Sequence, residues 1–129
     1  MKAKFEKIGE LTKRQIRLDS SNIPVVGNVV KFAAVGEYPY GTLVLIKAGE
    51  DGTPEATKYT ADADITGAVF GIVSDQQDIE VTEGKSVNGH VWISGAFARE
   101  DVEEVTGAKI KKFHEIAANA QFMIFGKHI

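Results

Sequence analysis

The longest strand-like region of the chain lies between residues 67 and 97, where short polar breaks separate three segments. The first segment, GAVFGIVS, is nearly all apolar, as expected for a strand that is covered on both faces. The second, DIEVTEG, alternates so that Ile79 and Val81 share one face. This region therefore predicts sheet.

The third segment, SVNGHVWISGAF, also alternates with a period of two residues. The alternation predicts two faces: Val91, Ile93 and Phe97 on one, and His90, Trp92 and Ser94 on the other. Gly95 stands where the first face should carry a side chain, so we expect the strand to kink there.

Further strands are predicted upstream. The segment PVVGNVVKFAAV (24–35) is β-branched and apolar, and we expect Gly27-Asn28 to interrupt it with a turn. Residues 38–41 (YPYG) predict a turn before a buried strand over 42–47. Asp51-Gly52 is a favoured hairpin pair, and KYTA is the expected returning strand.

The pattern changes after Phe97. REDVEEVTG (99–107) predicts a short helix with acidic residues in its first turn and Gly107 at its end. AKIKKFHEIAANA (108–120) predicts a second helix, which Asn119 ends, and QFMIF predicts a closing strand. About seven to nine short strands with one or two late helices predict an α+β fold that is mainly β.

The N-terminal part of the chain differs in charge from the rest. Residues 1–22 carry six basic and three acidic side chains, a net charge of +3, whereas residues 23–129 carry nine basic and fifteen acidic ones, a net charge of −6. We interpret 1–22 as a flexible arm and 23–129 as a single domain. Within the arm, residues 15–19 (QIRLD) alternate as a short strand would. The basic charge could attract an acidic partner, but on charge alone a solvated, partly disordered terminus is the favoured interpretation.

Composition excludes several classes of protein. The chain of 129 residues is 43% apolar and 26% charged, which is ordinary for one globular domain. It has no cysteine, so disulfides, thiolate metal sites and cysteine nucleophiles are excluded. No apolar stretch approaches the roughly 18 residues that cross a bilayer, and the first 22 residues do not resemble a signal peptide. We expect a soluble protein with no membrane partner, and the acidic body argues against a nucleic-acid partner.

Candidate catalytic and metal-binding motifs are weak. The three histidines, His90, His114 and His128, do not group with a nucleophile or at metal-ligand spacing. Asp62-x-Asp64 resembles the opening of an EF-hand loop, but the twelfth position, which should be a bidentate Glu, is Val73. A turn with side-chain hydrogen bonds explains this motif better.

The remaining polar motifs are also better explained without catalysis. The carboxylates at 100–101 and 103–104 are neighbours on a predicted helix and do not face each other, so a solvated or docking face accounts for them. Gly84-Lys85-Ser86 lacks the earlier glycine of a phosphate loop, since position 79 is Ile. We therefore predict no enzymatic activity, no metal and no cofactor.

The aromatic residues leave two interpretations open. Tyr38, Tyr40 and Trp92 lie beside Gly or Pro or on a predicted strand. They are either packed in the core and loops or serve as anchors of a subunit interface, where such side chains are enriched.

The order of these features resembles the head decoration protein D family of lambda-like phages. The resemblance covers about residues 38–125 and is carried by YPYGTLVL, by the small-residue strand GAVFGIV, and by VWISGAFAREDV, in which the strand reaching SGAF is followed at once by the acidic start of a helix. The apolar end AQFMIF fits the closing strand of that family.

The resemblance implies a structural role in the virion. Proteins of this family bind the exterior of the expanded capsid as homotrimers, so the implied partners are the major capsid protein and two further copies of the chain. Synthesis would take place in the cytoplasm of the bacterial host. The implied fold is a β-clip-like bent ribbon or small barrel. The arm is implied to add strand pairing to the capsid protein.

Specific contacts follow from the resemblance. The implied capsid-binding residues of the arm are Lys4, Phe5, Ile8, Lys13, Arg14, Ile16 and Leu18. The candidate subunit-interface residues, Tyr38, Tyr40 and Trp92, rest on residue type alone, because the trimer interface of the family does not carry over residue by residue.

Two departures from the family are visible. The arm of the lambda member is uncharged and rich in Thr, Pro and Ala, whereas this arm is charged, and this chain has the additional apolar segment 24–35. Whether the arm acts by strand addition or by electrostatic attraction therefore stays open. The alternative function is another virion structural or binding module, such as a head fibre base or tail component.

Overall fold

A computed structural model describes most of the chain. The described residues are 16–18, 25–62, 65, 67–110, 119 and 123–126. Their elements are β1 (Val26–Phe32), β2 (Gly36–Tyr38), β3 (Leu43–Ala48), β4 (Pro54–Lys58), β5 (Val69–Val73), β6 (Ile79–Val81), β7 (Val87–Ala98), α1 (Arg99–Thr106) and β8 (Met123–Gly126). Strands far outnumber the single described helix, which confirms the α+β, mainly β fold class.

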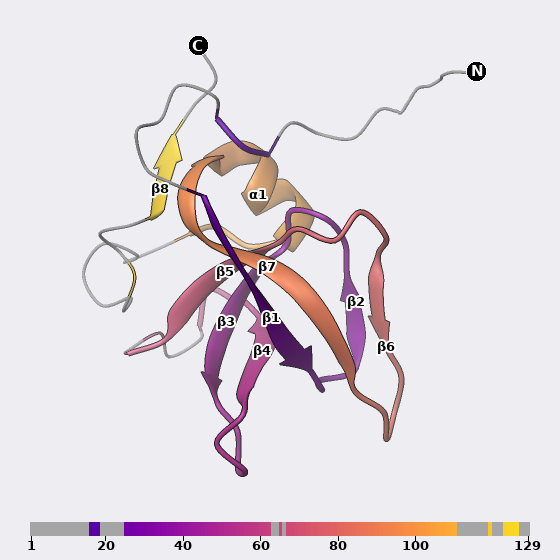
Figure 1. Cartoon of the computed structure of the whole chain (residues 1–129). Helices are drawn as coiled ribbons and strands as arrows, with labels where there is room; N and C mark the ends of the chain where they lie inside the picture. The colour runs from indigo at the N-terminus through magenta and orange to yellow at the C-terminus, as the bar shows by residue number, and fades with distance from the viewer. Residues whose placement is uncertain are drawn as a thin grey trace.

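The main sheet closes into a small barrel. Its strands follow the order β1-β4-β3-β5-β7, and β1 pairs with both β4 and β7, which joins the two ends of the sheet. Only the β1–β4 pairing in this ring is parallel. Figure 1 shows α1 and β8 at one end of the barrel and the two-stranded β2–β6 ribbon at its side.

Side chains of the sheet pack into two clusters because successive residues of a strand point to opposite faces. The interior cluster draws on all five barrel strands and on the ribbon: Val30, Phe32, Tyr38, Val44, Ile46, Ala56, Val73, Ile79, Val81 and Val91. The outer cluster lies between the sheet, α1 and β8: Ile16, Leu43, Leu45, Tyr59, Ile65, Ala68, Phe70, Ile72, Phe97, Val102, Ile110 and Met123. Both faces of β5 are therefore buried, as its apolar sequence predicted.

The predicted kink at Gly95 is confirmed, and it changes which face Phe97 occupies. Gly95 has φ +130°, a backbone conformation that favours glycine. Before it, Val91 packs in the interior cluster, whereas after it Phe97 packs in the outer cluster. The expectation that Val91 and Phe97 share one face is wrong, because the strand reverses its alternation where it leaves the barrel to pair with β8.

Two turns and the helix are confirmed. The turn at 38–41 is closed by the Thr42 N–H, which donates to the Pro39 carbonyl over 3.0 Å. The Asp51-Gly52 hairpin joins β3 to β4, and the Thr53 N–H that donates to Asp51 lowers the pKa of that carboxyl. α1 ends at Gly107, whose φ of +85° is left-handed as expected for a C-cap.

Two strand predictions are wrong in detail. Gly27-Asn28 does not form a turn, because β1 runs through both residues and pairs with β7 on either side of a register shift at Val26/Gly27. The strand returning from the hairpin begins at Pro54 rather than Lys58, because the tight loop closes early through a bond from the Gly49 N–H to the Thr53 carbonyl, 2.8 Å.

The C-terminal predictions are tested only in part. The closing strand is present as β8, which pairs in parallel with the end of β7. The predicted second helix, 108–120, falls mostly outside the described residues. No helix in the described part of the chain is long and apolar enough to cross a membrane.

Candidate functional site: the N-terminal strand and its aromatic neighbours

The three described residues of the N-terminal region, 16–18, pair with the end of β7 around one isolated β-bridge, and we call them the N-terminal strand. The Leu18 N–H donates to the Ala96 carbonyl over 2.9 Å, and the Ala98 N–H donates to the Ile16 carbonyl over 2.6 Å. Between them, Arg17 lies opposite Phe97 in an antiparallel bridge. Extended structure predicted within 15–19 is confirmed for these three residues, and its partner is the chain's own β7.

Ile16 belongs to the core. Its side chain is completely buried in the outer cluster. Its Cδ1 atom lies 2.8 Å from the position that a Cβ at Gly41 would take, and Val105 lines the same place. In this arrangement the side chain has no exposed surface to offer a partner, and the assignment of Ile16 as a capsid contact stays a prediction.

Leu18 is half-buried and packs toward β8, where its Cδ1 atom lies 3.4 Å from the Cβ position of Gly126. The other predicted capsid-binding residues, Lys4, Phe5, Ile8, Lys13 and Arg14, lie outside the described residues. Ile16 and Leu18 thus pack on the body, and the role of the five residues outside the described ranges stays a prediction.

Arg17 points outward and stacks on the single tryptophan. Its guanidinium lies 5.5 Å from the centroid of the Trp92 ring, within the range of a cation–π contact. Trp92 also contacts Tyr40 edge-on, with centroids 5.8 Å apart. Burial raises the pKa of Tyr40, and the nearby Arg17 charge partly offsets that rise.

Trp92 and Tyr40 are only partly buried, so part of each ring remains at the surface. The Trp92 ring is stacked at 5.8 Å on the fully buried Phe97, which holds it in place. This cluster of Arg17, Tyr40 and Trp92 joins the N-terminal strand to the barrel wall. Its role as a subunit interface stays a prediction for Tyr40 and Trp92.

Tyr38 does not belong to that surface. It is 2% exposed and packs edge-on against Phe32 in the interior cluster, with centroids 4.9 Å apart. Its hydroxyl donates to the Ala34 carbonyl over 2.6 Å, and burial raises its pKa. The ring has almost no exposed surface for a second subunit here, and the assignment of Tyr38 to a subunit interface stays a prediction.

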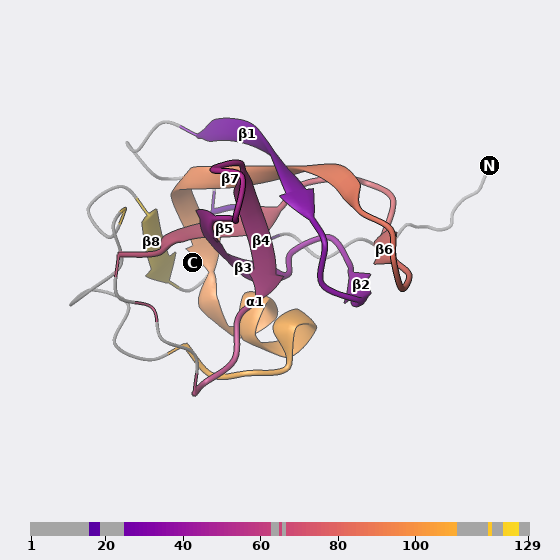
Figure 2. The same ribbon diagram turned by 90° about the horizontal axis from the view of Figure 1, so that it is seen from below.

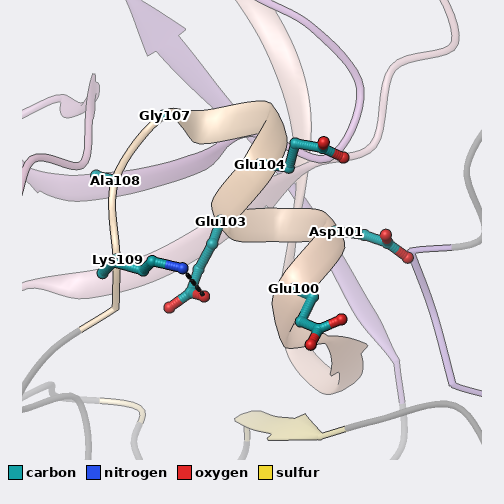
Figure 3. A pocket seen from close by; sticks show the side chains of 7 residues that line it. All are labelled: Glu100, Asp101, Glu103, Glu104, Gly107, Ala108 and Lys109. Atoms are coloured by element: carbon teal, nitrogen blue, oxygen red, sulfur yellow. Dashed lines mark ion pairs between the residues drawn. The ribbon is translucent and has the colours of Figure 1, made fainter.

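The acidic side chains of α1 surround a surface hollow, shown in Figure 3. Glu103 points toward Lys109, 3.8 Å away, whereas Asp101 and Glu104 point to the other side of the helix (Figure 3). The carboxylates thus do not converge on one point, as expected for neighbours on a helix.

Glu103 has a structural role at the end of α1. Its carboxylate accepts the Ile110 N–H at 2.7 Å and the Arg99 Nε–H at 3.2 Å. Arg99 in turn donates to the Ile110 carbonyl over 2.6 Å. These bonds hold the chain that follows the helix, which accounts for this carboxylate without catalysis.

A second polar hollow lies beside β6 and is lined in part by Asp75, whose carboxylate contacts His90. The Asp75 carboxylate accepts the His90 backbone N–H at 2.9 Å and faces its ring Nδ1 at 3.0 Å. Within the described ranges, no three His, Asp or Glu side chains are grouped closely enough to hold a metal ion.

Sequence analysis missed the role of Asn119. Its amide donates to the Phe70 and Ile93 carbonyls over 2.9 and 2.7 Å, and its Oδ1 accepts the Phe70 N–H at 2.9 Å. One side chain thus bridges β5 and β7 where the two strands no longer pair. A single asparagine in a predicted helix end carries no sequence signal for this role.

Comparison with known proteins does not identify the chain: no family model, curated protein or solved structure matches it.

Proposed function

We propose that this chain is a phage or prophage capsid decoration protein, a structural protein that binds the exterior of the expanded capsid as a homotrimer. The observation that carries the proposal is the attachment of a basic terminal segment to a compact barrel through an ordered strand. Residues 1–14 carry five basic and two acidic side chains, and they lead directly into the strand that Ile16 anchors.

The anchor supplies a physical reason for this arrangement. A segment that holds a body on a shell must transmit tension to that body. Here tension on residues 1–14 would act on two backbone hydrogen bonds to β7 and on the buried Ile16 side chain. Three such segments in one trimer would bind with avidity, so each contact can be individually weak.

The resemblance to the decoration protein D family supports the same proposal. The proposed partner is the major capsid protein, and the proposed location is the virion exterior. The proposed capsid contacts are Lys4, Phe5, Ile8, Lys13 and Arg14. Tyr40 and Trp92 are the proposed subunit contacts, because each keeps part of its ring at the surface.

The test is co-sedimentation with expanded, empty heads of the phage that encodes the chain. The informative truncation removes residues 1–14 and keeps Ile16, because removing residues 1–22 would also empty the core position beside Gly41. We expect saturable binding by the full chain and weaker binding by the truncated one. If basic side chains contribute, binding also falls with added salt.

A charge-matched pair of variants separates electrostatic attraction from strand addition. Lys13→Gln with Arg14→Gln neutralises two charges of the basic segment, and Lys85→Gln with Lys109→Gln neutralises two exposed charges of the body. Electrostatic attraction predicts that only the first pair weakens binding. If the full chain does not bind heads at all, the proposal is wrong. If the chain then forms stable trimers in solution, a fibre or tail component is the favoured function.

A further inference from the structure

In the described part of the chain, the first five residues of β1, 26–30, have one edge that is not paired. β7 pairs with one edge of β1 from Val26 to Phe32, whereas β4 pairs with the other edge only at Lys31 and Phe32. In the part of the chain that the structure describes, no strand pairs with the outer edge of residues 26–30. Figure 2 shows β1 along the outermost side of the barrel.

The backbone N–H of Val29 indicates that amide groups of β1 point toward this unpaired edge. In an antiparallel pair, alternate residues turn their N–H and C=O groups away from the partner strand. The Val29 N–H donates over 3.0 Å to Oδ1 of the adjacent Asn28 in an exposed bond. We infer that the Val29 N–H points away from β7. It could then donate to a carbonyl of an incoming strand in place of the Asn28 side chain.

The side chains at this edge are apolar and exposed. Val26 and Val29 are 46% and 52% exposed, and the segment 25–30 contains no charged residue. Proteins usually protect open edges with charged residues, proline or bulges because an unprotected edge pairs with other chains. A register shift at Val26/Gly27 is present here, but no charge opposes the approach of a second strand.

We propose that the outer edge of residues 26–30 binds an extended, uncharged strand of the capsid shell protein, an inference that rests on the proposed function. Backbone hydrogen bonds would supply affinity, and Val26 and Val29 would favour apolar side chains on the incoming strand. A second copy of the chain fits less well, because a stable interface between two copies uses roughly 20–30 residues on each side. Only five residues, 26–30, lie along this edge.

The position of the edge fits a partner that also contacts residues 1–14. Arg17 lies opposite Phe97, and Val26 lies opposite Ser94, so the N-terminal strand and β1 follow one another along the same edge of β7. Residues 16–18 thus lie near the end of β7 at which β1 begins. Two weak contacts on one partner would reinforce each other.

The test uses lysine substitutions at exposed apolar positions. Val26→Lys with Val29→Lys places charge on the open edge, and Ile124→Lys, at a position that is 44% exposed in β8, is the matched control. All variants are compared with the unmodified full chain by co-sedimentation with expanded, empty heads, after urea unfolding has shown that each is folded. We expect the double variant to bind about tenfold more weakly or worse, and the control to bind normally.

A second measurement reads the edge directly. Amide hydrogen exchange at Val29 should slow when heads are bound, because the incoming strand would protect the outward N–H. The conservative variant Val29→Thr keeps the β-branched shape and should bind like the unmodified chain.

The outcomes separate this inference from the proposed function. If the full chain does not bind heads, both are wrong. If it binds and the β1 double variant binds as well as Ile124→Lys, only the open-edge inference is wrong. If the purified chain self-associates in sedimentation velocity and the β1 substitutions abolish this, the occupant is a second copy and the assignment to a shell strand is overturned.

Discussion

The side chain of Ile16 occupies the space that a side chain at position 41 would need. Its Cδ1 atom lies 2.8 Å from the Cβ position of Gly41, and Gly41 has φ +92°. A residue near the N-terminus thus packs against the turn that precedes β3. This contact makes residues 16–18 part of the folded body, although their sequence lies within the segment predicted as an arm.

Replacing Ile16 should destabilise the whole protein. We expect Ile16→Ala to lower the free energy of unfolding by about 2–5 kcal/mol, the usual cost of emptying a buried aliphatic position. Ile124→Ala, at an exposed position, is the control and should change stability by less than about 0.5 kcal/mol. Urea unfolding measures both, and equal effects would show that Ile16 does not pack in the core.

Gly41→Ala should be destabilising for two separable reasons. The alanine would have a strained backbone and would also press on Ile16. Gly52→Ala, at φ +82° with open space around the Cβ position, shares only the backbone strain and should therefore cost less. A double-mutant cycle of Gly41→Ala with Ile16→Ala should show a coupling of about 0.5–3 kcal/mol, and additive effects would contradict the contact.

Asn119→Ala should lower the free energy of unfolding by about 1–3 kcal/mol, because it leaves partly buried backbone groups of Phe70 and Ile93 without their partner. Asn28→Ala is the control, since it removes only an exposed local bond to Val29. Thermal unfolding followed by circular dichroism compares the two. A larger loss for Asn28→Ala would contradict the bridging role.

Stability should fall at alkaline pH because of Tyr38. Burial raises the pKa of Tyr38, so folding favours its neutral form. The contribution is fully present below the ordinary tyrosine pKa of about 10, and it is lost as the pH rises through the raised value. Urea midpoints at pH 8 and at about pH 11 should differ less for Tyr38→Phe than for the unmodified chain. If the two urea midpoints differ by the same amount in Tyr38→Phe and in the unmodified chain, groups other than Tyr38 cause the loss of stability at alkaline pH.

Strands could be predicted from the sequence where the local pattern and the final environment agree. The apolar run at β5 and the alternation of Ile79 and Val81 in β6 both reflect burial that is set by position along the strand. The turn at 38–41 and the helix end at Gly107 were predictable because they depend on local backbone preferences.

Predictions failed where a distant partner decided the outcome. Gly27-Asn28 has the residues of a turn, yet the long β7 strand pairs on either side of it and holds it extended. The kink at Gly95 was predicted, but the face of Phe97 was not, because beyond the kink β7 leaves the barrel and pairs with β8. Neither the length of the pairing strand nor its bend can be deduced from the residues of β1.

The candidate site divides in the same way. The sequence by itself determined the basic character of residues 1–14, the single tryptophan, and the uncharged stretch 25–30. Only the tertiary structure decided that Ile16 and Tyr38 are buried, that Arg17 lies over Trp92, and that no described strand pairs with the outer edge of residues 26–30. The reason is that charge and apolarity belong to each residue, whereas burial and strand pairing depend on segments that are distant along the chain and meet only when the barrel closes.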